Sequence, residues 1–143
     1  MNKILTREAQ KKLALLWFSN AALLGILFIL FTVFNRFDGK TSEGWGWYIQ
    51  NIIPTLTLML GAFYNINKRK SEANKPIDTF YYKLSYYISL FYLCILYLTV
   101  LLAPLAIRLV NGSFLNVLNE SKIYLTIMQG LVSYSIGMFF TQK

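Results

Sequence analysis

Histidine, cysteine and acidic residues are scarce in this chain of 143 residues. It has no histidine, one cysteine and six acidic residues, against fourteen lysines and arginines. The lack of histidine excludes histidine-ligated metal sites and histidine-based proton transfer. A single cysteine excludes a thiolate cluster and an intrachain disulfide framework. The sequence also has no Gly-rich phosphate loop and no serine-nucleophile motif, so we expect a protein that is not an enzyme and that uses no cofactor or metal.

The acidic residues also avoid the apolar parts of the chain. Hydrophobic residues make up 56% of the sequence, and no Asp or Glu lies at the centre of a long apolar run. A transporter coupled to protons or cations normally needs an ionisable group inside the membrane. We therefore do not expect an ion-coupled carrier.

Four long apolar stretches take up most of the sequence. A helix needs about 20 residues to cross the hydrocarbon core of a bilayer, and its backbone must be hydrogen-bonded internally there. The stretches predict an all-α polytopic membrane protein, folded as a single four-helix transmembrane domain over residues 1–143. The predicted spans are about 13–34, 47–66, 80–108 and 122–140.

Positive charge is distributed unequally over the connections between these spans. Ten of the fourteen Lys and Arg residues fall in the N-terminal segment, in or near the basic loop 67–79, or at the C-terminus. Basic residues favour the cytoplasmic side, so we expect both termini in the cytoplasm and a multi-pass protein of the plasma (inner) membrane. A composition rich in Asn, Lys, Ile, Tyr and Phe is typical of AT-rich bacterial genomes and favours a bacterial membrane.

The basic loop offers contacts to partners other than the bilayer core. Lys68, Arg69, Lys70 and Lys75 are placed to contact anionic lipid headgroups or a cytoplasmic protein partner. A nucleic-acid site would need a longer and folded platform, so we expect no nucleic acid.

The connections contain residues that predict where helices begin and end. Gly39, Gly44 and Gly46 predict a loop over 35–47, and Trp45, Trp47 and Tyr48 predict the outer membrane boundary of the second span. Residues 111–121 predict a second outer loop, with Asn119 or Ser121 capping the last helix, while Asp78 or Thr79 caps the third. Cys94, in the middle of the third span, is expected to be a small buried hydrophobe.

Polar residues recur at helical spacing inside the spans. Asn51 and Thr55 share one face of the second span, and Gln129 and Ser133 share one face of the fourth. Two interpretations stay open, since such faces form helix–helix seams in lipid and could also line a water-filled path between protomers. Pro54 and Pro104 are hinge candidates. The hydroxyls of Tyr92 and Tyr97 lie deep in the third span and need partners on other helices.

These features leave two main hypotheses for function. In the first, the protein self-assembles as a homo-oligomer through its polar and small-residue faces, and forms a channel or perturbs membrane integrity as an effector or toxin does. In the second, it is a non-conducting accessory, anchor or immunity subunit that binds a protein partner through its cytoplasmic segments. A carrier of small solutes without ionic coupling is a third and weaker alternative.

Overall fold

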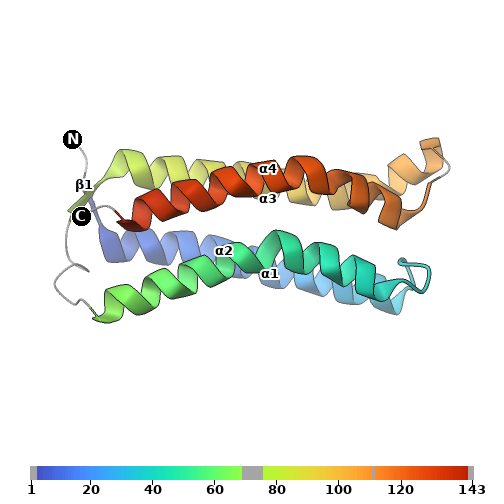
Figure 1. The fold of residues 1–143 in the computed structure, drawn as a ribbon, viewed down its shortest axis with the longest axis horizontal. Coiled ribbons are helices and arrows are strands. Elements are labelled where there is room, and N and C mark those ends of the chain that lie inside the picture. Colours follow the sequence, from blue (N-terminus) through green and yellow to red (C-terminus); the bar gives the residue numbers. More distant parts are fainter. Residues whose placement is uncertain (1–2, 69–75, 111, 142–143) are drawn as a thin grey trace.

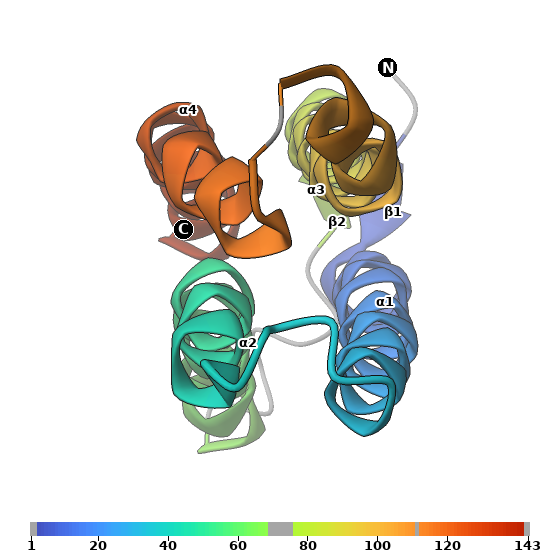
Figure 2. The same cartoon turned by 90° about the vertical axis from the view of Figure 1, so that its right-hand side faces the viewer.

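The computed structural model, which describes residues 3–68, 76–110 and 112–141, is a bundle of four long helices. The helices are α1 (Thr6–Val33), α2 (Thr41–Lys68), α3 (Thr79–Val110) and α4 (Phe114–Thr141). They run alternately up and down the bundle axis (Figure 1). Viewed along that axis, α1 lies next to α2 and α3, and α4 lies next to the same two helices (Figure 2). The predicted all-helical bundle is confirmed.

The bundle has two distinct ends. We call the end where α1 begins and α4 ends the termini end, and the opposite end, which carries the turns 34–40 and 112–113, the far end (Figure 1). At the termini end two short strands, β1 (Lys3–Leu5) and β2 (Pro76–Asp78), pair antiparallel, with Ile4 opposite Ile77. Each strand leads directly into a helix, so this pairing joins the start of α1 to the start of α3. No pattern in the sequence indicates these strands.

Two helices, α1 and α3, are long and apolar enough to cross a membrane. The qualifying segments are Arg7–Val33 and Thr79–Ile107. Helices α2 and α4 have 28 residues each, but they are less apolar overall because Gly, Asn, Gln, Ser and Thr recur along them.

The turn from α1 to α2 is set by residues that tolerate a left-handed backbone. Asn35 ends α1 with φ of 50°, and Asp38 and Gly39 follow with φ of 49° and 80°. The amide of Arg36 donates to the carbonyl of Phe31 and the amide of Asn35 to that of Thr32, which is the Schellman arrangement for closing a helix. Asn and Asp adopt this conformation more readily than other residues with a side chain, so Asn35 and Asp38 suit the turn, which lies within the predicted loop 35–47.

Both predicted outer loops are too long. Helix α2 begins at Thr41 and includes Gly44 and Gly46, and α4 begins at Phe114, so Asn119 and Ser121 lie inside a helix instead of capping one. The reason is packing in both cases. The ring of Phe37 packs directly against Gly44, in the space that a side chain would fill, and Phe114, Leu115 and Leu118 bury one face of the first turns of α4.

The helix caps and the cysteine give one confirmed and one wrong prediction. The carboxylate of Asp78 accepts a hydrogen bond from the amide of Phe80 at 3.0 Å, so Asp78 caps α3 as predicted.

Cys94, by contrast, is exposed on the outer face of α3. The apolar run around Cys94 is hydrophobic on all sides of the helix, so its sequence could not indicate which residues face the other helices.

Candidate functional site

A proline interrupts the backbone hydrogen bonding of α2 halfway along the bundle. Pro54 lies well inside α2, beyond its first turn. Because proline has no N–H, the carbonyl of Gln50 loses its donor four residues on. The side chain of Gln129 on α4 donates to this carbonyl at 3.1 Å, and more weakly to the carbonyl of Asn51 at 3.4 Å. The side-chain amide of Gln129 on α4 therefore replaces the backbone donor that α2 lacks at Pro54.

Asn51 connects the interrupted part of α2 with α3. Its side-chain amide donates to the carbonyl of Trp47 at 2.8 Å. The hydroxyl of Tyr92 on α3 contacts both oxygens of Asn51, the backbone carbonyl at 3.0 Å and the side-chain oxygen at 3.2 Å. The ring of Tyr92 also stacks on Trp17 of α1, with centroids 5.9 Å apart. We call Gln50, Asn51, Tyr92 and Gln129 the polar cluster. With Trp17 it brings all four helices together.

Other polar side chains near the cluster are buried without a hydrogen bond. Among the side chains that the structure describes, these are Gln10, Trp17, Thr55 and Ser89, each with a buried nitrogen or oxygen that has no partner. Thr55 lies one helical turn from Asn51, and Ser89 lies one turn from Tyr92. Ser133, the fourth predicted polar residue, is half-buried on α4. The structure thus brings Asn51 and Gln129 into contact and places Thr55 beside them.

Aromatic rings fill the interior between the polar cluster and the far end. Phe28 is fully buried and stacks on Trp47 with centroids 5.7 Å apart and an interplanar angle of 4°. Phe37 also packs against Phe28, and Phe114 packs against Phe37. The indole of Trp47 donates to the hydroxyl of Ser121 at 2.9 Å. We call Phe28, Phe37, Trp47 and Phe114 the aromatic cluster.

The aromatic cluster corrects one prediction and adds to another. Trp47 is completely buried, so its ring packs between helices and does not lie on the outer surface of the bundle, as a ring at a lipid interface would. The interior buries the large apolar ring of Trp47 and also provides an acceptor for its indole N–H. Trp45 and Tyr48 are only half-buried. Tyr97 donates to the carbonyl of Asn20 at 3.2 Å. Both deep tyrosines, Tyr92 and Tyr97, therefore have the partners on other helices that the sequence predicted.

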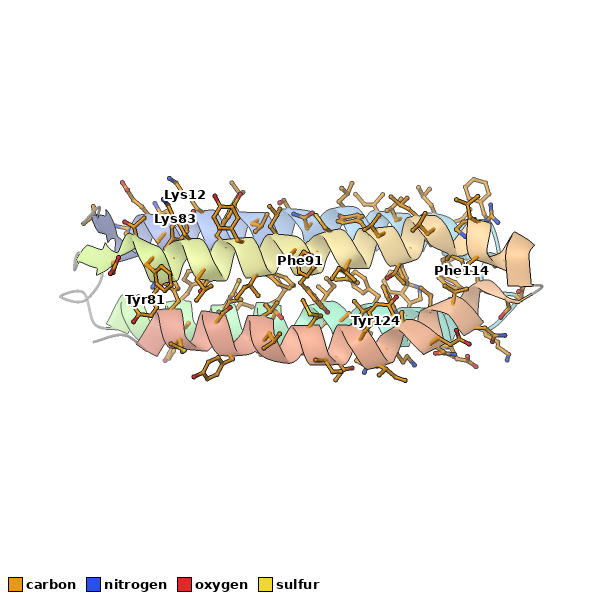
Figure 3. The ribbon with its side chains drawn as sticks, turned by 90° about the horizontal axis from the view of Figure 1, so that it is seen from above. Lys12, Tyr81, Lys83, Phe91, Phe114 and Tyr124 are labelled. Carbon is orange, nitrogen blue, oxygen red and sulfur yellow. The ribbon has the colours of Figure 1, made fainter. Side chains whose placement is uncertain are left out.

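The remaining predicted residues lie apart from the polar cluster. Pro104 is inside α3, in its last two turns before Val110. Lys68 is the last residue of α2, whereas Arg69, Lys70 and Lys75 fall outside the described residues. Other basic residues of the termini end are exposed, and Figure 3 shows two of them, Lys12 and Lys83, at this end on the side formed by α1 and α3.

Sequence reasoning missed the carbonyl of Gln50 and the side chains of Trp17 and Trp47. The carbonyl had a clear signal, because a proline inside a helix always leaves the carbonyl four residues earlier without its donor. The tryptophans had no such signal, since a tryptophan in an apolar run suits a lipid interface and a helix interior equally well.

The chemistry available at the polar cluster is neutral hydrogen bonding. Its groups are amides, a phenol and backbone carbonyls, and within the described residues no three His, Cys, Asp or Glu side chains come together to hold a metal ion. No family model, curated protein or solved structure matches the chain.

Proposed function

We propose that the protein is an integral membrane protein in which all four helices cross the bilayer, with the termini end in the cytoplasm. The polarity of the bundle supports this. Large hydrophobic side chains are exposed on the outside of every helix, such as Ile29, Leu60, Leu101 and Ile127, which are 53–64% exposed. Buried polar side chains lie inside, whereas a bundle that folds in water has its polar face outward.

The placement of charge supports the same arrangement. Residues 13–35, 44–67, 84–107 and 123–142 contain no Lys, Arg, Asp or Glu. A helical segment of 20 residues is about 30 Å long, which equals the thickness of the hydrocarbon core. Each helix can therefore cross with its charges outside the core, and the larger basic set of the termini end would face the cytoplasm.

Cys94 provides a direct test of membrane insertion. It is exposed on the bundle and lies halfway along α3, about 22 Å from either end at 1.5 Å per residue. In native membranes we expect a charged maleimide to leave Cys94 unlabelled until the membrane is dissolved in denaturing detergent. The control is Ser42→Cys in a Cys94→Ser background, because Ser42 is exposed at the far end and its thiol would react without detergent. Rapid labelling of Cys94 in intact membranes would show that the bundle is not inserted.

We further propose that copies of the protein assemble into a channel or a membrane-permeabilising complex. The observation that carries this proposal is the interruption of α2 at Pro54, halfway across the bundle, where the carbonyl of Gln50 depends on Gln129. Irregular backbone at membrane depth is tolerated only where protein or a water-filled cavity covers it, and polar groups there often mark solute paths. A displacement of α4 would free the carbonyl of Gln50 to coordinate water or an ion.

The outer face of α4 offers a surface for self-assembly. Thr126 and Gly130 are exposed on this helix, and a side chain added at Gly130 would meet no atom within 4 Å. Small residues allow helices to approach closely in lipid, where van der Waals contacts drive association.

Dye release from liposomes tests the channel. We expect the purified protein to release a small dye, and Gln129→Leu to reduce the release about tenfold because it removes the polar side chain that faces the open carbonyl of Gln50. The matched control is Gln50→Leu, since the side chain of Gln50 is exposed and only its carbonyl belongs to the polar cluster. Dye release that is equal in both variants would contradict a path through the cluster.

If the liposomes release no dye, the result would instead favour the second function, a non-conducting accessory subunit that binds a protein partner. The observation that supports this second function is the group of exposed cations at the termini end, which includes Arg7, Lys11, Lys12 and Lys83. Such a surface suits an acidic cytoplasmic partner.

A further inference from the structure

We infer that each bundle contains an internal water site at mid-depth, bound by the indole N–H of Trp17 and the hydroxyls of Thr55 and Ser89. These three groups come from three different helices. All three side chains are completely buried, and their polar atoms have no hydrogen-bond partner in the described part of the chain. The inference concerns hydration of a single bundle, so it holds whether or not the protein conducts.

The three groups lie at nearly the same depth. Asn51 and Tyr92 are hydrogen-bonded and therefore mark one level of the bundle. Thr55 follows Asn51 by one turn on α2, which runs toward the termini end, and Ser89 precedes Tyr92 by one turn on α3, which runs away from it. At 1.5 Å per residue both hydroxyls lie about 4.5–6 Å from that level, on the same side. The ring of Trp17 reaches this region because it stacks on Tyr92.

The chemistry of the three groups fits water better than an ion. A buried water usually makes about three hydrogen bonds to polar groups that would otherwise be unsatisfied. The indole can only donate, so it would donate to the water oxygen, and the water could then donate its two hydrogens to the two hydroxyl oxygens. The segments of α1, α2 and α3 at this depth carry no charged residue, and an ion buried without a counter-charge would be strongly disfavoured.

The distribution of unsatisfied groups indicates the side from which water enters. The fourth unsatisfied group, Gln10, lies two turns before Trp17 on the same face of α1, toward the termini end. Toward the far end, the buried polar side chains that the structure describes are paired, as in the bonds Trp47–Ser121 and Tyr48–Ala21, and the aromatic cluster fills the interior. Water therefore reaches the site from the termini end and stops at the aromatic cluster.

Hydrogen exchange of the indole groups tests this inference. Trp17 and Trp47 are both completely buried, but only Trp47 has a protein partner. In lipid nanodiscs transferred to deuterated water, with indole signals assigned from Trp→Phe variants, we expect the Trp17 N–H to exchange at least tenfold faster than that of Trp47. Equal rates, or a slower rate at Trp17, would overturn the inference. Global unfolding cannot imitate the expected result, because it would expose both indoles equally.

Removing the hydroxyls provides a second measurement. Thr55→Val and Ser89→Ala should each slow the exchange of Trp17 severalfold and leave that of Trp47 unchanged, because they remove partners of the water. Both substitutions should also lower the folding equilibrium constant or leave it unchanged. If the hydroxyls are dry and unpaired, an apolar replacement relieves their burial instead, and Thr55→Val would raise that constant by about tenfold, which corresponds to 1.4 kcal/mol. A rise of that size would overturn the inference.

Discussion

Gly44 and Gly46 lie in the same turn of α2, and replacing each by alanine should have opposite effects on stability. A Cβ added at Gly44 would lie 2.5–2.7 Å from three ring atoms of Phe37, whereas one added at Gly46 would meet nothing within 4 Å. Carbon atoms in contact are normally about 3.5–4.0 Å apart, so the ring of Phe37 would have to move by about 1 Å. That ring is 1% exposed and packs against Phe28, Phe31 and Phe114.

Two opposing contributions set the change in the free energy of unfolding. Replacing a helical glycine by alanine in an exposed position stabilises the helix by about 1 kcal/mol, and this is the expected effect of Gly46→Ala. Forcing extra volume into a packed core costs about 1–3 kcal/mol. For Gly44→Ala the cost exceeds the gain or balances it, so we expect a net loss of about 0–2 kcal/mol. The two variants should therefore differ by about 1–3 kcal/mol in the free energy of unfolding.

Reversible unfolding in mixed micelles, followed by helical circular dichroism, measures this difference. Phe37→Leu in combination with each alanine variant completes a double-mutant cycle. The smaller side chain should recover most of the loss at Gly44 and have no interaction with Gly46. If Gly44→Ala and Gly46→Ala stabilise the protein equally, Phe37 does not occupy the space beside Gly44, and the explanation for the early start of α2 is wrong.

Two further substitutions test contacts between helices. Pro54→Ala returns a backbone donor to the carbonyl of Gln50, so Gln129→Leu should cost about 1 kcal/mol less in that background than in the original protein; equal costs in the same unfolding assay would show that Gln129 does not compensate for the proline. A Cβ at Gly25 would lie 3.2 Å from the hydroxyl of Tyr48, which donates to the carbonyl of Ala21 at 2.9 Å. Gly25→Ala should therefore be close to neutral alone, but should stabilise by about 1 kcal/mol when Tyr48 is replaced by Phe, and an identical effect in both backgrounds would contradict this contact.

The existence of the four helices followed from the sequence because long apolar runs have few alternatives in lipid. Their starting points at the far end did not. Residues 41–46 are mostly polar or glycine and read as a loop, yet they continue a helix because Trp47 and Phe37 bury themselves in the bundle. Tertiary packing overrides local propensity in such short segments.

The candidate site was predictable in part. Polar groups in an apolar setting need partners, and this principle identified Tyr92 as a residue that faces other helices. Helical spacing placed Asn51 on a polar face, but left open whether that face was a helix seam or a path for water. The partner of the Gln50 carbonyl could not be identified in the same way. That step requires knowing that α4 lies beside α2, and this neighbour relation depends on how the two helical hairpins pack together.

The pairing of β1 with β2 has a consequence for biosynthesis. Ile4 and Ile77 are more than seventy positions apart in the chain, so the ribosome completes α1 and α2 before the segment that pairs with the N-terminus emerges. The first residues must remain unpaired until that moment. A bulky reporter fused in front of Lys3 would lie directly beside this strand pair, which forms late. It would delay the packing of the α3–α4 hairpin against the α1–α2 hairpin.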